Sequence, residues 1–329
     1  MTDETITTVG TRLSFRDYFG AFRMRVGAER EKYRVAPGIY KVGAPSLSSP
    51  VFVSANYKMS FDFLRRGLSG INAWILVLNT RGVNVWCAAG KKTFSTNEIV
   101  RMVKESELEN FVSHRELILP QLSAPGVSAH EVMKKSGFKV RFGPIRAEDI
   151  KRFMANGKKA DAEMRTVTFN IWERFILTPR ELTSRITTSF YIISAIFIIS
   201  SAGNETLVRG LFGTTAYFIG LFAGTIVTPL LLPWLPGRSF ALKGAVTGII
   251  LGSLFCFLFG GHGNMATAAM LIFAMSVSSY TALTFTGATP FTSPTGVEKE
   301  MRRAIPLQIA AVVLSCGLWI GNSFIGGGL

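Results

Sequence analysis

The pattern of hydrophobic and polar positions divides the chain into two parts. The last 144 residues carry few charges, and three long stretches there, 210–237, 244–297 and 304–329, contain no Asp, Glu, Lys or Arg. A fourth uncharged stretch covers residues 186–204. A helix needs about 20 apolar residues to cross a bilayer, and the longest stretch is interrupted by a glycine-rich segment at 260–264. The pattern therefore predicts five membrane-spanning helices.

We expect these five spans near Arg185–Ala202, Gly210–Leu232, Ala241–Gly260, Met265–Thr286 and Ala304–Phe324. Two of the spans carry glycines at four-residue spacing, which are Gly220 and Gly224, and Gly244, Gly248 and Gly252. This spacing puts small residues on one helix face, where a second helix can approach closely. Glycine is also common in membrane helices in general. The spacing nevertheless favours a compact bundle.

The first part of the chain alternates short apolar runs with amphipathic segments. Strands are expected at Val51–Ala55, Ala73–Leu78, Leu117–Leu119 and Phe138–Phe142. Helices are expected from Ser60 as cap to Leu68, from Ser95 as cap to Phe111, from Ser128 to Ser136, and from Ala147 to Ala155. This alternation is typical of a parallel, doubly wound, Rossmann-like α/β sheet. Ligands bind such sheets at the carboxyl ends of the strands, so the loops after the four strands are the candidate sites.

The expected organisation has four parts in all. They are a cover segment for the sheet at 1–50, an α/β domain at 51–160, a helical linker at 161–184, and an all-α transmembrane bundle of five helices at 185–329. The linker has several aromatic residues on one side, as expected of a helix lying against a bilayer.

The charge of the chain is concentrated in its first 185 residues, which hold 30 Lys and Arg against 18 Asp and Glu. A nucleic-acid interface would need a basic stripe with interleaved aromatic residues, whereas a basic domain beside an anionic inner leaflet needs no such pattern. The second explanation is favoured, so a membrane lipid partner and no nucleic acid are expected.

The loops between the spans predict the orientation of the chain. Lys and Arg precede the first span and lie between the second and third and between the fourth and fifth, while the other loops hold only Arg209. Basic loops stay in the cytoplasm. We therefore expect a multi-pass inner-membrane protein with a cytoplasmic N-terminal domain and an external C-terminus, and the polar first thirty residues predict no signal peptide.

The loop after the strand Ala73–Leu78 contains a single cysteine, Cys87. A lone cysteine is most often a small buried hydrophobic residue. A phosphate loop is excluded, because Val85 stands where its first glycine would be and Lys92 stands where Ser or Thr would bind magnesium. A nucleophilic Cys/His pair is poorly supported, since neither histidine of this part has an obvious orienting acid nearby. The three cysteines of the chain form no Cys-x-x-Cys, so no iron-sulfur cluster is expected within it.

The sequence around this cysteine resembles a known family. The string Asn84-Val85-Trp86-Cys87-Ala88-Ala89-Gly90-Lys91 is similar to the signature of the HgcA family, corrinoid membrane proteins that methylate mercury. The segments 53–58, 119–122 and 124–127 are similar to the same family, which also has five membrane spans after its corrinoid domain. The α/β part is also similar to the corrinoid-binding domain in the large subunit of the soluble corrinoid iron-sulfur protein of the acetyl-CoA pathway.

The resemblance implies that a cobalamin-type corrinoid binds at the carboxyl end of the sheet, with the Cys87 thiolate as cobalt ligand and catalytic residue. The chain has no Asp-x-His-x-x-Gly string, from which commoner cobalamin domains supply a histidine ligand. A thiolate is a soft, strongly donating ligand. Its donation would favour transfer of methyl as a carbanion equivalent to Hg(II), giving methylmercury.

The resemblance also assigns neighbouring residues. The expected cofactor-binding residues are Ser54, Asn56, Asn84, Val85, Trp86, Ala88, Ala89, Gly90, Lys91 and Thr93. We expect Asn84 to cap a short helix over 84–89 and Trp86 to anchor that helix in the core. Two alternatives stay open for Lys91, contact with the corrinoid amides or simple solvation, and two for Ser54, a hydrogen bond near the cofactor or an ordinary strand-end hydroxyl.

The chain departs from the family at Lys92 and Ser95, where relatives usually have glycine, and at Asn79, where Asp is more usual. A positive φ at a residue other than glycine costs about 1 kcal/mol. If either position needs one, the departures affect cofactor retention or activity rather than the fold.

The resemblance implies partners and leaves alternatives for function. The partners are a ferredoxin-like protein with two iron-sulfur clusters, a methyl-donating methyltransferase, and Hg(II) as substrate. Alternatives are a membrane-anchored corrinoid methyl carrier of one-carbon metabolism and a cobalamin-binding protein without turnover. Cys256 and Cys316 fall in the third and fifth spans. Buried thiols in the membrane core are favoured over a mercury relay for these two residues.

Overall fold

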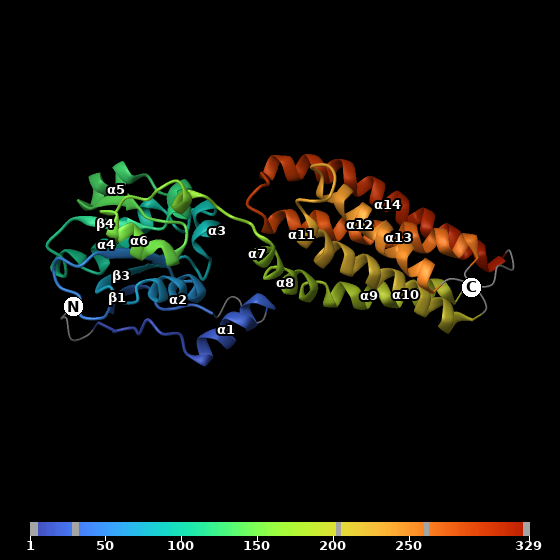
Figure 1. Ribbon diagram of the computed structural model, residues 1–329, viewed down its shortest axis with the longest axis horizontal. Helices are drawn as coiled ribbons and strands as arrows, with labels where there is room; N and C mark the ends of the chain where they lie inside the picture. The colour runs from blue at the N-terminus through green and yellow to red at the C-terminus, as the bar shows by residue number, and fades with distance from the viewer. Residues whose placement is uncertain (1–5, 28–32, 202–204, 260–262, 325–329) are drawn as a thin grey trace. The chain divides into compact units, whose positions relative to one another are not determined.

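The computed structural model describes residues 6–27, 33–201, 205–259 and 263–324. The chain divides into two compact units, Met1–Thr168 and Phe169–Leu329. The first is an α/β unit and the second is built of helices (Figure 1). Each unit is described separately.

The first unit is built on a five-stranded sheet of order β1-β3-β2-β4-β5. The strands are β1 (Gly38–Val42), β2 (Val51–Ala55), β3 (Ala73–Leu78), β4 (Glu116–Leu119) and β5 (Lys139–Phe142). Strands β2 to β5 are parallel, and they match the four strands expected from the sequence. The sheet is nevertheless mixed, because β1 pairs antiparallel with β3.

Strand β1 lies in the segment that we expected only to cover the sheet. It brings Ile39 opposite Leu76 and Val42 opposite Ala73 at the edge of β3. Glycines stand at both of its borders, Gly38 and Gly43, and both have positive φ. Glycines at such positions are typical of loops, which explains why no strand was predicted here.

Helices cover both faces of the sheet. In the first unit these are α1 (Phe15–Arg25), α2 (Lys58–Gly67), α3 (Val85–Gly90), α4 (Thr96–Glu105), α5 (Ala129–Ser136) and α6 (Ile150–Ala155). On one face, Val51 and Val53 of β2 pack in a core that includes Ile99 of α4. On the other face, Phe52 packs with Phe61 of α2 and with residues of α6. The alternation of side chains along β2 thus feeds two separate cores.

The helix limits agree with the capping residues in most places. Ser95 and Ser128 accept hydrogen bonds from the third residue of α4 and α5, and Gly137 ends α5 with φ of 74°. Two expectations were wrong. Ser60 lies inside α2, whose N-cap is Tyr57, and α4 ends at Glu105, so the segment up to Phe111 is not one helix.

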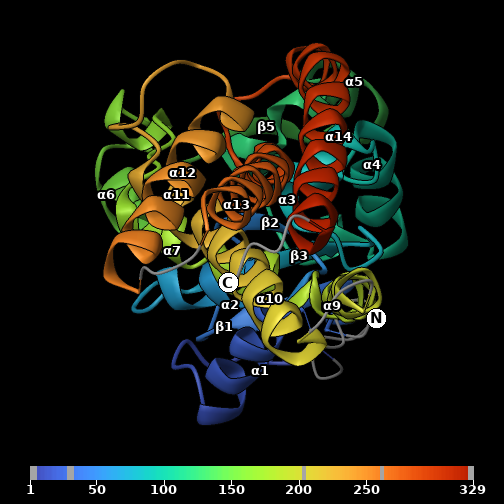
Figure 2. The ribbon, with the colours of Figure 1, turned by 90° about the vertical axis from the view of Figure 1, so that its right-hand side faces the viewer.

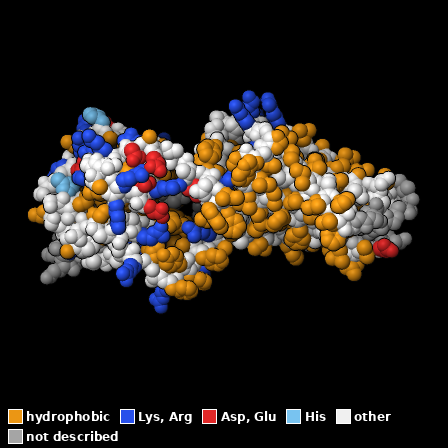
Figure 3. All heavy atoms as spheres, in the orientation of Figure 1, with side chains coloured by type: hydrophobic (Ala, Val, Ile, Leu, Met, Phe, Trp, Pro, Cys, Tyr) orange, Lys and Arg blue, Asp and Glu red, His pale blue; other side chains and the backbone are white. Residues whose placement is uncertain are grey.

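The second unit consists entirely of helices and turns within its described residues. Its helices are α7 (Ile171–Phe175), α8 (Thr178–Thr183), α9 (Ile186–Ser200), α10 (Thr206–Phe222), α11 (Thr228–Leu231), α12 (Phe240–Leu258), α13 (Asn264–Thr284) and α14 (Pro294–Phe324). A π-helical turn, Ala223–Val227, joins α10 to α11. Hydrophobic side chains cover much of the face of this unit that Figure 3 shows.

Four helical segments of the described chain are long and apolar enough to cross a membrane. They are Thr206–Leu231, Phe240–Leu258, Asn264–Ala288 and Pro294–Phe324. A fifth crossing arises if Ile171–Thr183 and Ile186–Ser200, which meet at a bend of 55°, form one span. The unit is therefore compatible with a membrane protein of four or five spans. Residues 202 and 260–262, where we expected a span end and a break, lie outside the described residues.

The glycines at four-residue spacing pack against one common helix, α13. A Cβ atom on Gly220 would lie 2.6 Å from the carbonyl oxygen of Ala274, and one on Gly244 would lie 2.5 Å from that of Ser278. Figure 2 shows α13 with α10, α12 and α14 around it. The predicted close approach of helices is thus confirmed, and α13 is its centre.

We expected Arg209 in a loop, but it lies in a helix. Helix α10 already begins at Thr206, so Arg209 stands in its first turn and is buried. Its guanidinium group donates to the carbonyl oxygen of Trp319 at 2.7 Å and lies 4.9 Å from the centre of that indole ring. A cation can be buried in this way because the aromatic face and the carbonyl replace part of its hydration.

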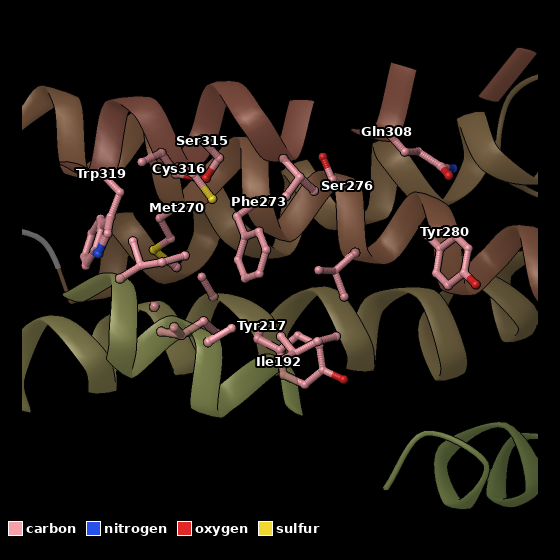
Figure 4. Close-up of a pocket in the computed structure, with 18 of the residues that line it drawn as sticks. Ile192, Tyr217, Met270, Phe273, Ser276, Tyr280, Gln308, Ser315, Cys316 and Trp319 are labelled. Carbon is pink, nitrogen blue, oxygen red and sulfur yellow. The ribbon is translucent and has the colours of Figure 1, made fainter. Parts of the chain in front are cut away.

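An apolar cavity of about 580 Å³ lies among α9, α10, α13 and α14. Figure 4 shows Tyr217, Phe273 and Trp319 among the side chains that surround it. Cys316 lines the same cavity. The Cys256 sulfur lies 3.7 Å from that of Met270, which is also part of the wall. Both cysteines are thus half-buried inside the bundle.

Candidate functional site

The loops that follow β2, β3 and β4 form the candidate site. Strand β2 stands between β3 and β4 in the sheet, and all three are parallel. Their carboxyl ends therefore meet at one edge, at the place where the strand order reverses, which is the usual ligand site of open α/β sheets. Helix α3, which follows β3, contacts the turn Gln121–Gly126, which follows β4.

Helix α3 presents Cys87 on a fixed backbone. The side-chain oxygen of Asn84, the N-cap, accepts a hydrogen bond from the backbone N–H of Cys87 at 2.9 Å. Ala88 and Ala89 lie on the buried face of the helix, while Cys87 is exposed. The short helix predicted from the sequence is confirmed, and its thiol is open to a ligand.

We expected Trp86 to anchor this helix in the core, but it does not. Its side chain is 44% exposed. The helical period places Val85, Ala88 and Ala89 on the inner face and Trp86 beside Cys87 on the outer face. Val85 and Ala88 pack against the hydrophobic core and anchor the helix instead.

Asn56 organises the loop between β3 and α3. Its side chain is buried, and its Oδ1 atom accepts hydrogen bonds from the backbone N–H groups of Thr80 at 3.1 Å and Gly82 at 2.9 Å. The Thr80 hydroxyl lies 2.9 Å from the same oxygen. We predicted Asn56 as a cofactor contact. In the structure its Oδ1 atom is hydrogen-bonded to this loop. Thr80 was missed because nothing in the local sequence links it to a residue 24 positions earlier.

Replacing Asn56 with alanine should loosen the loop that leads into α3. The change leaves the buried N–H group of Gly82 without an acceptor, which costs about 1–3 kcal/mol. The Thr80 N–H group loses one acceptor and keeps the carbonyl oxygen of Leu78 at 3.1 Å. Hydrogen exchange of residues 79–91 in the full chain should report a local destabilisation of about 1–3 kcal/mol. Asn56→Asp keeps the acceptor oxygen and should exchange more slowly than Asn56→Ala. Equal exchange in all three proteins would contradict this role.

The other predicted residues differ in their surroundings. Ser54 is buried, and its hydroxyl donates to the backbone oxygen of Ala55 at 3.2 Å. Gly90 and Lys91 are exposed at the end of α3. The Thr93 hydroxyl donates to the backbone oxygen of Ala88 at 3.4 Å. Ser54 and Thr93 thus contribute to the local structure, while Gly90 and Lys91 lie open to solvent.

Glu98 also contributes to this edge of the sheet. One of its carboxylate oxygens accepts a hydrogen bond from the backbone N–H of Asn79 at 2.8 Å. The same carboxylate pairs with Arg101 at 2.6 Å. We expected Glu98 only as part of a helix cap, and its side chain in fact ties the end of β3 to α4.

Of the two positions where relatives usually have glycine, Lys92 and Ser95, only one has a strained backbone. Lys92 has φ of 59°, a left-handed conformation that favours glycine. Ser95 has φ of −140° and caps α4, so the absence of glycine there carries no strain.

Replacing Lys92 with glycine should therefore stabilise the end of α3 by about 1 kcal/mol. The measurement is hydrogen exchange of residues 87–94 in the full chain. Lys92→Ala is the matched control, because it removes the charge and retains the strained backbone. If alanine stabilised this segment as much as glycine does, charge rather than backbone strain would be the cause.

Two features of the turn Gln121–Gly126 concern its packing on α3 and its capacity to bind a cofactor. A Cβ atom on Gly126 would clash with the backbone oxygen of Phe94 and lie 3.0 Å from the Cα atom of Ala89, so backbone meets backbone here. The side-chain oxygen of Gln121 is buried and has no hydrogen-bond partner among the described residues. A buried acceptor without a partner suits an external donor, such as the amide side chains of a corrinoid.

No three His, Cys, Asp or Glu side chains gather into a metal site within the described ranges.

Residues 28–154 match the CdhD family, described as the CO dehydrogenase/acetyl-CoA synthase delta subunit. The first unit thus resembles a CdhD-family domain. The matched residues include β2 to β5 and the whole of α3. They end before the second unit begins.

Curated relatives of this CdhD-like part are gamma subunits of the acetyl-CoA decarbonylase/synthase complex. The subunit of Archaeoglobus fulgidus is 31% identical over 127 residues, which are 38% of this chain and 27% of the relative. That of Methanopyrus kandleri is 28% identical over 127 residues, with the same shares, and that of Methanocaldococcus jannaschii 26% over 132 residues, 39% and 26%. The chain thus spans about a quarter of the length of each relative. These matches support the expected likeness to the acetyl-CoA pathway more than mercury methylation.

Proposed function

We propose that this chain is a membrane-anchored corrinoid protein that carries a methyl group between a donor and an acceptor. The observation that carries the proposal is Cys87, exposed on a capped helix at the carboxyl edge of the CdhD-like sheet. The four or five apolar helices of the second unit support attachment to a membrane. We further propose that the first unit faces the cytoplasm, because basic residues gather in the loops on that side.

The corrinoid would lie against α3 and the turn Gln121–Gly126. The close backbone approach of Gly126 to Ala89 packs the turn against α3, and Gln121 offers an unpaired oxygen. Cys87 would be the ligand from the protein. When bound, the corrinoid would supply a cobalt centre that accepts and releases methyl.

The residues of the chain hold the thiol in place for this role. Asn84 fixes the first turn of α3, Asn56 fixes the loop before it, and Glu98 fixes the end of β3. A site positioned in this way loses little freedom when its ligand binds. Cys87 must give up its proton on binding, because a thiolate is the metal ligand.

The acceptor distinguishes two versions of the proposal. The relatives named as acetyl-CoA decarbonylase/synthase subunits favour a one-carbon acceptor, with other subunits, including an iron-sulfur protein, as partners. Hg(II) is the second candidate, favoured by the resemblance of residues 84–91 to the HgcA signature and by the apolar helices. A soft thiolate ligand from Cys87 would favour delivery of the methyl group to a soft metal ion.

The test uses the purified full chain in lipid nanodiscs, loaded with methylcobalamin and mixed with a thiol complex of Hg(II). Formation of methylmercury faster than with free methylcobalamin would support Hg(II) as acceptor. If the chain binds methylcorrinoid but transfers no methyl group to Hg(II), the result would support the one-carbon carrier and exclude Hg(II) as acceptor. A chain that binds no corrinoid would overturn both versions.

A further inference from the structure

Helix α1 exposes the face that a helix of a soluble domain would normally bury. Its aromatic residues stand at i, i+3, i+4 and i+7, and their exposed fractions are 81% for Phe15, 56% for Tyr18, 51% for Phe19 and 58% for Phe22. The rings of Phe15 and Phe19 stack with centroids 6.1 Å apart. These four side chains, the α1 aromatic face, form a continuous stripe along the helix.

The opposite face of α1 is polar or small, and it holds the helix to the sheet domain. Asp17 forms ion pairs with Lys58 at 2.6 Å and Arg65 at 2.8 Å. Gly20 lies against Tyr33 so closely that a Cβ atom would be 2.6 Å from its ring. Met24 is buried on the same side. The helix is therefore docked in one orientation, with its aromatic face outward.

The ion pairs make this docking firm. Burial alone would raise the pKa of Asp17, but hydrogen bonds from Lys58, Ser14 and Arg65 outweigh it and hold that pKa well below its usual value. The carboxylate stays charged and paired at neutral pH. Rotation of α1 to bury its aromatic rings would break this network.

The charges around the aromatic face indicate its partner. Arg12, Arg16 and Arg23 are exposed on or beside α1, whereas Asp17, its one acidic residue, is turned inward. Figure 3 shows hydrophobic side chains gathered over the segment that Figure 1 labels α1. An aromatic stripe with flanking arginines matches the requirements of an anionic lipid surface. The apolar helices that follow in the same chain keep the first unit close to such a surface.

We propose that α1 is an interfacial membrane helix that inserts Phe15, Tyr18, Phe19 and Phe22 among the headgroups of anionic lipids. The first unit is then attached to the bilayer through α1 as well as through the start of the second unit. Two attachments fix the orientation of the unit, so that the edge carrying Cys87 has a constant relation to the membrane plane. This proposal does not depend on the cofactor or on the acceptor.

The test replaces Phe19 with photoreactive benzoylphenylalanine in the full chain, in nanodiscs that contain anionic phospholipid. After illumination, mass spectrometry should find lipid adducts at position 19. Met133 on α5 is the matched control, because it is similarly exposed, at 49%, on another helix. Adducts should be several-fold more frequent at position 19, and should decrease when the anionic lipid is replaced by phosphatidylcholine.

A charge variant separates lipid attraction from simple exposure. Arg16→Glu and Arg23→Glu should lower the adduct yield at position 19 by about fivefold for each arginine lost. Hydrogen exchange of α2 and β3 should stay unchanged and show that the fold is intact. Equal lipid adducts at positions 19 and 133 would overturn the proposal. Adducts of position 19 to a second copy or to the second unit would overturn it too, because they would assign the aromatic face to a protein partner.

Discussion

Replacing Cys87 with alanine is expected to reduce the proposed methyl transfer to the rate of the free cofactor and to leave the fold of the first unit intact. The thiol is exposed and packs in no core, and the backbone N–H of residue 87 can still donate to Asn84. Alanine also favours the helix. The loss should therefore concern the proposed cobalt ligand alone. The absorption spectrum of the full chain reconstituted with methylcobalamin should differ between the two proteins, and transfer should fall to the rate of the free cofactor.

Cys316→Ala is the control for this prediction, because it removes a thiol that lies in the bundle and not at the sheet edge. It should keep the spectrum and the transfer rate of the natural chain. Identical spectra for the natural chain and Cys87→Ala would show that cobalt is not held by this thiol. The corrinoid would then need another ligand or none from the protein.

Replacing Gly224 with leucine should disrupt the packing of the second unit. A Cβ atom at this position would clash with the Thr281 hydroxyl and the Ser278 carbonyl oxygen, and would lie 2.9 Å from the Cα atom of Ser278. Backbone atoms of α13 cannot move aside as a flexible side chain can. The π-helical turn that carries Gly224 must therefore move away from α13. Overpacking of this kind costs about 1–3 kcal/mol or more. Thermal unfolding of the full chain in detergent, followed by circular dichroism, should shift to lower temperature.

Gly317→Leu provides the matched comparison. Gly317 also lies in a helix of the second unit, α14. Apart from its own helix backbone and chain neighbours, no atom of the described residues lies within 4 Å of its hypothetical Cβ atom. Leucine there should change the unfolding temperature little. Equal shifts for both variants would mean that loss of helical glycine, and not the contact with α13, determines the effect.

The sequence predicted those features of the site that depend on neighbouring residues. Asn84 caps a helix three positions before Cys87, and such caps are visible in the local pattern. The four parallel strands were also predicted from local sequence patterns. The hydrogen bonds of Asn56 to the loop at Thr80 and the close approach of Gly126 to Ala89 were not, because the sheet brings together residues that are far apart in the chain.

Two other features depended on which face of a helix is turned inward. The resemblance implied that Trp86 anchors α3 in the core, but the core side of this helix is occupied by Val85 and by alanines. The first fifty residues were expected only to cover the sheet, so the aromatic stripe of α1 was not predicted. The ion pairs of Asp17 and the burial of Met24 show which face of the helix is docked. In both cases the large aromatic residue lies on the outside, where burial cannot explain it.

The central place of α13 also has a consequence for the synthesis of the protein. The glycine faces of α10 and α12 both pack on α13, which comes later in the chain. The ribosome therefore releases these two helices before their common neighbour exists. A nascent chain that ends before Asn264 contains both glycine faces and neither contact, and the bundle can close only after Thr284 has been added.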